Sequence, residues 1–187
     1  MIEINDGLVA ELKLFIKENY KLISLGKLFS GGKGKQFDPG EIARGMRPKN
    51  FGDASDLLSA FVKERRDYED FAHVLDKLRT EKGLSAADLY KAAWIDKRVY
   101  SKIMTTSNYR PAKSTAIAFG LALNLKGDEF DEFLKTAGFS LSESSIFDLT
   151  IRFCVSKEYF DLHDVNAFLL TMDQKLLVRE QVDEVSP

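Results

Sequence analysis

The sequence has little of what secreted, metal-binding or membrane-spanning proteins need. One cysteine, Cys154, stands among 187 residues, so no internal disulfide can form, and its place in the apolar run 151–155 predicts a buried thiol. No apolar run approaches the ~20 residues of a membrane-spanning helix. The two histidines, His73 and His163, lie far apart in the chain and have no cluster of carboxylates or cysteines beside them. We therefore expect neither a metal site nor another cofactor.

The chain also lacks a strong excess of one charge. Its formal net charge is −2, although 30% of its residues are charged, which argues against a protein that coats nucleic acid indiscriminately. A hydrophobic content of 44% predicts a folded rather than a disordered chain. The first residues, MIEINDG, have neither the basic region nor the apolar core of a signal peptide. We expect a soluble, cytoplasmic protein that does not contact membranes.

Residues 1–68 form an N-terminal region of mixed character. Apolar residues recur every three to four positions over residues 5–24, which predicts an amphipathic helix capped by Asn5 or Asp6. Its apolar stripe packs either on the rest of the chain or on a second protein, in a dimer or with another partner. Residues 26–50 are rich in glycine and lysine and predict a loop. This loop lacks phosphate-loop spacing, so it is a solvated loop or a contact for a phosphate backbone. A second helix follows, capped by Asp53 or Ser55.

The central region, residues 69–139, has the pattern of five short helices. The first ends at Lys82-Gly83, with glycine as the cap, and Ser85 begins the second, with Asp88 completing a capping box. Asp96 caps the third helix, at 97–104, whose apolar seam alternates with basic and polar residues. The fourth helix is expected at 112–124 and the fifth from residue 128 to the Ala-Gly pair at 137–138.

Several short motifs in this region resemble the lambda-repressor-like (Cro-type, XRE) helix-turn-helix family. KGLS at 82–85 matches the start of that family's second helix, and YSKI at 100–103 matches its third. RPA at 110–112, followed by Ile117, Leu121 and LNL at 123–125, matches the segment after the third helix. The resemblance covers residues 71–138. It implies an all-α, five-helix bundle whose third helix enters the DNA major groove, here with N- and C-terminal helical extensions.

Three positions depart from that family's pattern. Tyr90 stands where a small residue, mostly alanine, lets the second and third helices cross closely. Trp94 stands where glycine usually allows a left-handed turn, so either this turn differs in shape or the two helices pack further apart. Ala86 replaces a glutamine that commonly holds a phosphate. These departures bear on DNA binding more than on the fold.

Residues 100–177 also resemble, more narrowly, a bacterial module found on the C-terminal side of unrelated domains. The shared motifs are YSKI at 100–103, PAKSTAIA at 111–118 and SSIFD at 144–148. Within residues 140–177 the pattern predicts a helix capped between Ser142 and Ser145 and a last helix ending near Leu177. This C-terminal extension is too apolar to be a tail and should pack on the central bundle, whereas residues 178–187 form a flexible tail.

The leading functional hypothesis is a sequence-specific transcriptional regulator that binds double-stranded DNA. Between residues 70 and 115, nine basic side chains stand against five acidic ones, which fits oriented phosphate contact or, equally, an ordinary solvated surface. A single small reader normally needs a dimer to span two half-sites, so we expect a homodimer. The expected DNA-binding residues are Lys97 and Arg98 for base edges, Ser101 and Lys102 along the groove, and Arg110 and Lys113 for phosphates.

The second hypothesis is a protein interaction module, in the manner of an adaptor or antitoxin, that keeps the fold without binding DNA. Four amphipathic aromatic residues surround the expected reading surface, and such residues are enriched at protein contacts: Tyr90, Trp94, Tyr100 and Tyr109. The same residues also suit simple core packing. No motif pairs a nucleophile with a base or two catalytic acids, so we expect no enzyme.

Overall fold

The computed structural model describes residues 6–20, 59, 70–107 and 109–179. All regular structure in these ranges is helical and no strand occurs in them, which confirms the all-α prediction for the described residues. The helices are α1 (Asp6–Asn19), α5 (Phe71–Glu81), α6 (Ala86–Ala92), α7 (Lys97–Thr105), α8 (Lys113–Ala122), α9 (Gly127–Thr136), α10 (Ile146–Ser156) and α11 (Leu162–Thr171). The predictions for the loop at 26–50, the helix after Asp53 or Ser55 and the tail at 180–187 lie outside the described residues.

Three helices begin at the side-chain caps that the sequence predicts. The Ser85 hydroxyl accepts the N–H of Asp88, and the Asp88 carboxylate accepts the N–H of Ser85, so the predicted capping box is present. Asp96 accepts the N–H of Arg98 at 2.6 Å and caps α7. Ser145 caps α10 in the same way. These local hydrogen bonds satisfy backbone donors that have no partner inside the helix.

Six helices end in one and the same backbone motif. The residue after the C-cap takes a left-handed conformation, and the next N–H bonds back to a carbonyl of the last turn, as in a Schellman motif. Glycine occupies the left-handed position at only two of these ends; the six residues are Gly83, Trp94, Asn124, Gly138, Glu158 and Asp173. At two of the ends without glycine the helix is shorter than predicted: α8 ends at Ala122 rather than residue 124, and α11 ends at Thr171 rather than near Leu177.

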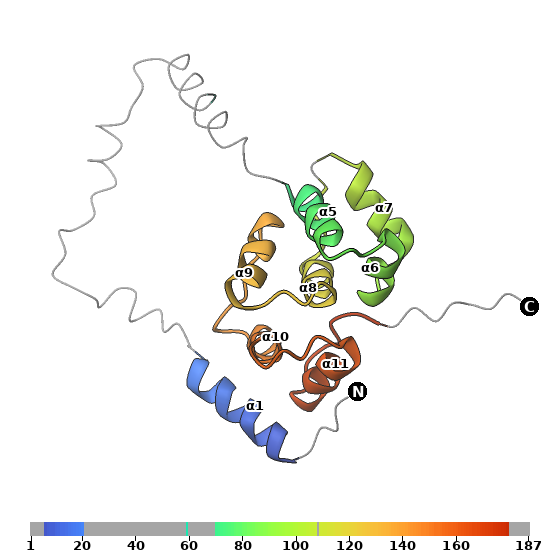
Figure 1. Cartoon of the computed structure of the whole chain (residues 1–187). Helices are drawn as coiled ribbons and strands as arrows, with labels where there is room; N and C mark the ends of the chain where they lie inside the picture. Colours follow the sequence, from blue (N-terminus) through green and yellow to red (C-terminus); the bar gives the residue numbers. More distant parts are fainter. Residues whose placement is uncertain (1–5, 21–58, 60–69, 108, 180–187) are drawn as a thin grey trace, which may run out of the picture. The chain divides into compact units, whose positions relative to one another are not determined.

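The core of the described unit is built around α8. Residues 116–121 of this helix are all buried, and α8 packs against α6 and α9. Helix α5 packs against α7 and α9, and α7 packs against α6, so that helices α5–α9 form one group in Figure 1. Gly120 permits the close approach of α8 to α9, because a Cβ there would lie 2.7 Å from Cε2 of Phe130. The aromatic side chains that are fully buried in this core are Phe119, Phe130, Phe133, Phe153 and Phe168.

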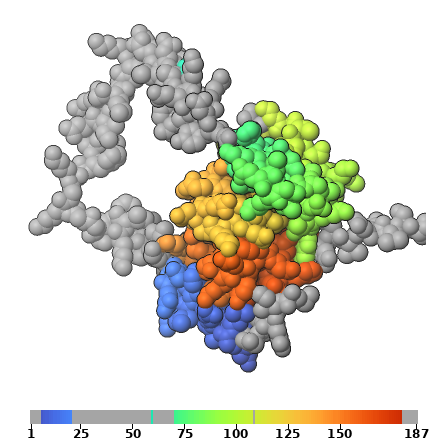
Figure 2. Space-filling model, viewed as in Figure 1, coloured from blue at the N-terminus to red at the C-terminus, as the bar shows by residue number. Residues whose placement is uncertain are grey.

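Helix α1 packs on α10, which is the contact within the chain that the sequence offered as one of two alternatives. Figure 2 shows α1 in blue against the orange of the C-terminal helices. Leu12 and Ile16 are buried, and the rings of Phe15 and Phe153 meet edge to face with centroids 5.5 Å apart. Lys157 and Glu11 add an ion pair. The helix runs from Asp6 to Asn19, so residue 20, which was predicted to be helical, lies outside it.

Ion pairs join the region of α9 to that of α10. Arg152 bonds Asp131 of α9 at 3.2 Å, and Lys126 bonds Glu158 at 2.6 Å. The thiol of Cys154 is buried as predicted, and burial raises its pKa. No helix in the described ranges is long and apolar enough to cross a membrane.

Candidate nucleic-acid interface

Helix α7 has one buried side and one exposed side. Tyr100 and Ile103 are buried in the core, with Val99 and Met104 half-buried beside them. The positions three and four residues apart on the opposite side are exposed: Lys97, Arg98, Ser101, Lys102 and Thr105. Because the apolar seam follows the helical period, the sequence alone orients this helix, and its polar side chains all face away from the core.

The cations of this face have no carboxylate partner within the described residues. Six cations elsewhere in the described residues form ion pairs, for example Arg79 with Asp76 and Lys157 with Glu11. None of these pairs involves Lys97, Arg98 or Lys102. Asp96 lies next to them, but its carboxylate is occupied in capping α7 through the N–H of Arg98. The face therefore presents positive charge that the described part of the chain does not neutralise.

Lys102 and the loop after α7 are held together by a cation–π contact. The Nζ of Lys102 lies 4.9 Å from the centre of the Tyr109 ring, which is half-buried. Arg110 follows directly and is exposed, and a Cβ on Gly138 would lie 3.7 Å from its Nη1. The structure thus places Arg110 just beyond the end of the α7 face, on the loop that leads to α8.

Lys113 differs from the other expected DNA-binding residues because it has an internal partner. Its Nζ donates to Oδ2 of Asp148 at 2.6 Å, and the Lys113 side chain is 32% exposed, whereas that of Asp148 is 5% exposed. The same oxygen accepts the N–H of Ser142 at 2.8 Å. Sequence reasoning missed this pairing, because 35 residues separate the two partners.

The turn between α6 and α7 is left-handed although it carries a tryptophan. Trp94 has φ 52°, its N–H donates to the carbonyl of Lys91, and the N–H of Ile95 donates to the carbonyl of Tyr90. The alternative that tryptophan changes the shape of the turn is therefore wrong, because Trp94 adopts the left-handed backbone that glycine usually adopts here. The indole is half-buried and meets the ring of His163 of α11 edge to face, with centroids 4.4 Å apart. This packing offsets the ~1–2 kcal/mol that a left-handed backbone costs a residue with a Cβ.

Tyr90 fills the space between α6 and α7. Its ring lies 5.8 Å from that of Tyr100, and the Tyr100 ring lies 6.1 Å from that of Phe119 in α8. Burial raises the pKa of Tyr100 above its ordinary value. A cluster of three aromatic rings, one pair tilted and the other edge to face, thus occupies the crossing where the resembling family has a small residue.

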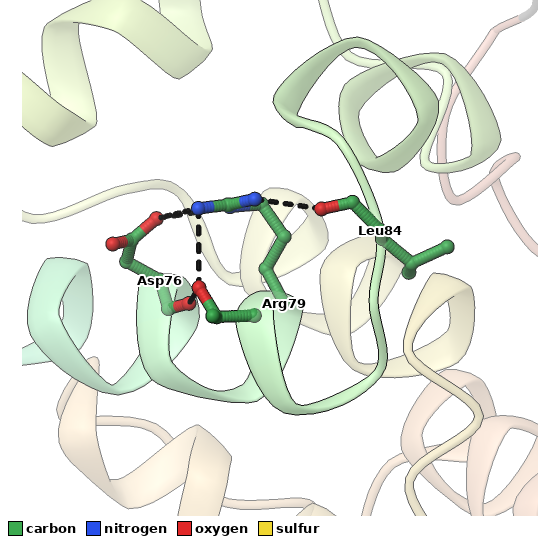
Figure 3. A network of polar contacts seen from close by, with 4 residues as sticks. Asp76, Arg79 and Leu84 are labelled. Atoms are coloured by element: carbon green, nitrogen blue, oxygen red, sulfur yellow. Dashed lines mark hydrogen bonds and ion pairs between the residues drawn. The ribbon is translucent and has the colours of Figure 1, made fainter.

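Arg79 fixes the loop that leads into α6, and nothing in the sequence pattern singled it out. Figure 3 shows its guanidinium between the Asp76 carboxylate and the carbonyl of Leu84, which it bonds at 2.6 Å. The Thr80 hydroxyl accepts a hydrogen bond from Nη2 of Arg79 and donates one to the carbonyl of Asp76. The hydrogen bond with Asp76 raises the pKa of Arg79. Arg79 therefore holds α5 to the residue that precedes the Ser85 cap and so helps to set the angle of α6.

Comparison with known proteins adds no relative: no family model, curated protein or solved structure matches this chain.

Proposed function

We propose that the chain binds double-stranded DNA through the exposed face of α7 and acts as a helix-turn-helix regulator of transcription. One observation carries the proposal: the α7 face presents three cations that have no carboxylate partner in the described part of the chain. Phosphates supply the missing negative charge when such a face meets a duplex. The order of α5–α9, with α7 packed on α5 and α6, fits a lambda-repressor-like bundle.

The positions on α7 suggest separate roles for its residues. Lys97 and Arg98 lie in the first turn, which is the part of a recognition helix that reaches base edges. Arginine suits bidentate contact with guanine. Ser101 and Lys102 lie one turn later and face the same way, so they follow the groove. Arg110 is exposed on the next loop and serves as a phosphate contact.

Lys113 has a structural role in this proposal rather than a phosphate contact. Its ammonium group neutralises the buried carboxylate of Asp148, and a phosphate would have to compete with that ion pair. We retain the homodimer as part of the proposal, because one small reader covers only a half-site. The solution mass of the purified chain tests it.

An interaction module that does not bind DNA remains the second candidate, but its main support is weaker in the structure. The four aromatic residues on which it rests all have partners inside the chain: Tyr90 with Tyr100, Tyr100 with Phe119, Trp94 with His163, and Tyr109 with Lys102. Tyr100 is buried, and the other three are half-buried. A pull-down performed with and without nuclease separates the two candidates, because a protein partner that survives nuclease favours the second.

Selection from a random duplex library tests the DNA-binding proposal. We expect a preferred sequence for the wild type and, for Arg98→Ala, loss of preference at one base pair worth about 1–3 kcal/mol. Lys135→Ala is the matched control, because Lys135 is an exposed cation on α9 that pairs with Glu132. It should leave the preference unchanged. If no sequence is enriched by the wild type, or if both variants behave alike, the reader has been assigned wrongly.

A further inference from the structure

A cavity of about 450 Å³ opens where the turn before α7, the end of α8 and the start of α11 meet. Its size lies within the range of small-molecule sites, which commonly form between packed elements. It takes no part in the proposed DNA contact. The residues that give it its chemistry are Trp94, Leu121, Asn124, Phe160, Asp161 and His163.

The electrostatic character of the cavity favours a cation. Ala92 and Ala122, the final residues of α6 and α8, both line it, and a helix carries a partial negative charge at its C-terminus. Asp161 is the carboxylate among the lining residues, and no lysine or arginine of the described chain lines the cavity. The N-terminus of α11 supplies one opposing partial positive charge, and His163 is the basic side chain among the lining residues. The negative charge of Asp161 and the two helix C-termini outweigh the partial charge of the α11 N-terminus.

Asp161 has unused capacity to accept a donor. Its Oδ1 accepts the N–H of His163 at 2.8 Å and that of Asp164 at 3.3 Å, as the N-cap of α11. Its Oδ2 accepts no hydrogen bond from a described residue. An ammonium group at this oxygen would form a charge-assisted hydrogen bond.

The other walls are apolar or aromatic. Leu121 and Phe160 line the cavity together with the indole of Trp94. An aromatic wall next to a carboxylate suits a ligand with an apolar body and a positive head, because the ring faces attract cations while the body is removed from water. An inorganic cation would leave the apolar walls unused, and an anion would meet the charge of Asp161.

We propose that this cavity binds a small organic cation, a primary ammonium attached to a compact aromatic or aliphatic body. The ammonium bonds Asp161, and the body lies against Trp94. The ligand then touches both the left-handed turn that leads into α7 and the first turn of α11.

Fluorescence of Trp94 provides a direct test, because it is the only tryptophan in the sequence. The full chain is titrated with phenethylammonium chloride and, separately, with 2-phenylethanol, its uncharged analogue, at constant ionic strength. We expect a saturable change in emission and at least about tenfold tighter binding of the ammonium compound, which corresponds to one charge-assisted contact. An unsaturable response, or equal affinity for the two probes, would overturn the proposal.

Asp161→Asn locates the site. Asparagine is as good an N-cap as aspartate, so α11 should persist while the charge is lost, and the preference for the ammonium probe should fall to about threefold or less. The matched control is Asp173→Asn, which removes a negative charge at a residue that does not line this cavity and should keep the full preference. A full preference in Asp161→Asn would place the cation elsewhere. If that variant does not fold, as judged by circular dichroism, the two-probe comparison on the wild type decides.

Discussion

The Nζ of Lys113 lies 2.6 Å from Oδ2 of Asp148, and the carboxylate that it neutralises is among the few buried charged groups of the described chain. The pair joins the first residue of α8 to the first turn of α10, and Asp148 also accepts the N–H of Ser142. It therefore connects the central bundle to the C-terminal extension through a low-dielectric contact, which makes it costly to break from either side.

Removal of the lysine should destabilise the fold. Lys113→Ala leaves the buried Asp148 without its counterion, and we expect a loss of about 2 kcal/mol, at the low end for buried pairs because the lysine is one-third exposed. Urea unfolding measures it. Lys126→Ala, which breaks the exposed pair with Glu158, is the control and should cost less than about 1 kcal/mol. Equal losses in the two variants would mean that the Lys113 pair is solvated like a surface pair.

The left-handed turn at Trp94 predicts an unusual ranking of two variants. Trp94→Gly and Trp94→Ala both lose the contact with His163, but only alanine keeps the cost of φ 52°. We expect Trp94→Gly to be the more stable of the two by about 1 kcal/mol, measured by urea or thermal unfolding. A more stable alanine variant would contradict a left-handed backbone at this position.

Gly120 should not tolerate alanine, although alanine is the better helix former. At a solvent-exposed helix position, glycine to alanine raises the stability by about 1 kcal/mol. At Gly120, however, the new Cβ would lie 2.7 Å from the Phe130 ring. We expect Gly120→Ala to lose about 1–3 kcal/mol in unfolding experiments. Adding Phe130→Leu should return part of the loss, because the smaller side chain leaves room. A stabilising Gly120→Ala would show that α8 and α9 do not approach so closely.

The capping box of α6 should make stability depend on pH in the acid range. Hydrogen bonds from the Ser85 hydroxyl and N–H hold the pKa of Asp88 below its ordinary value of 3.8. The ionised group therefore stabilises the fold above that value, and this contribution is lost as the pH falls through the lowered pKa. Asp88→Asn should lower the urea midpoint at neutral pH, and its difference from the wild type should vanish in strong acid. A difference that persists there would assign the effect to something other than ionisation.

The features that the sequence predicted correctly, the helix caps and the exposed side of α7, depend on residues close together in the chain. Ser85, Asp96 and Ser145 cap helices as expected, because each cap bonds an N–H only two or three residues away. The exposed side of α7 followed from its own apolar period. These features need no knowledge of distant residues.

What the sequence did not reveal depends on contacts between segments far apart. The left-handed helix ends at Trp94 and Asn124 have no glycine, so the sequence does not mark them. The Trp94 ring packs on His163 of α11, and the predicted end of α8 fell at Asn124, two residues beyond the observed end. The ion pair of Lys113 with Asp148 of α10 could not be predicted, because its two partners lie 35 residues apart. Arg79 is a local exception: it bonds Asp76, three residues before it, and the carbonyl of Leu84, five residues after it, and no sequence motif marks these contacts.

The salt dependence of duplex binding tests the α7 assignment most directly. We compare Lys97→Ala/Arg98→Ala/Lys102→Ala with Lys126→Ala/Lys135→Ala/Lys157→Ala, which removes the same charge from exposed, ion-paired lysines elsewhere. Each lost phosphate contact should reduce the slope of log K against log salt concentration by about 0.9. We predict a reduction of about two to three for the α7 variant and almost none for the control. Equal slopes in the two variants, or no measurable duplex binding by the wild type, would contradict the proposal that α7 binds DNA.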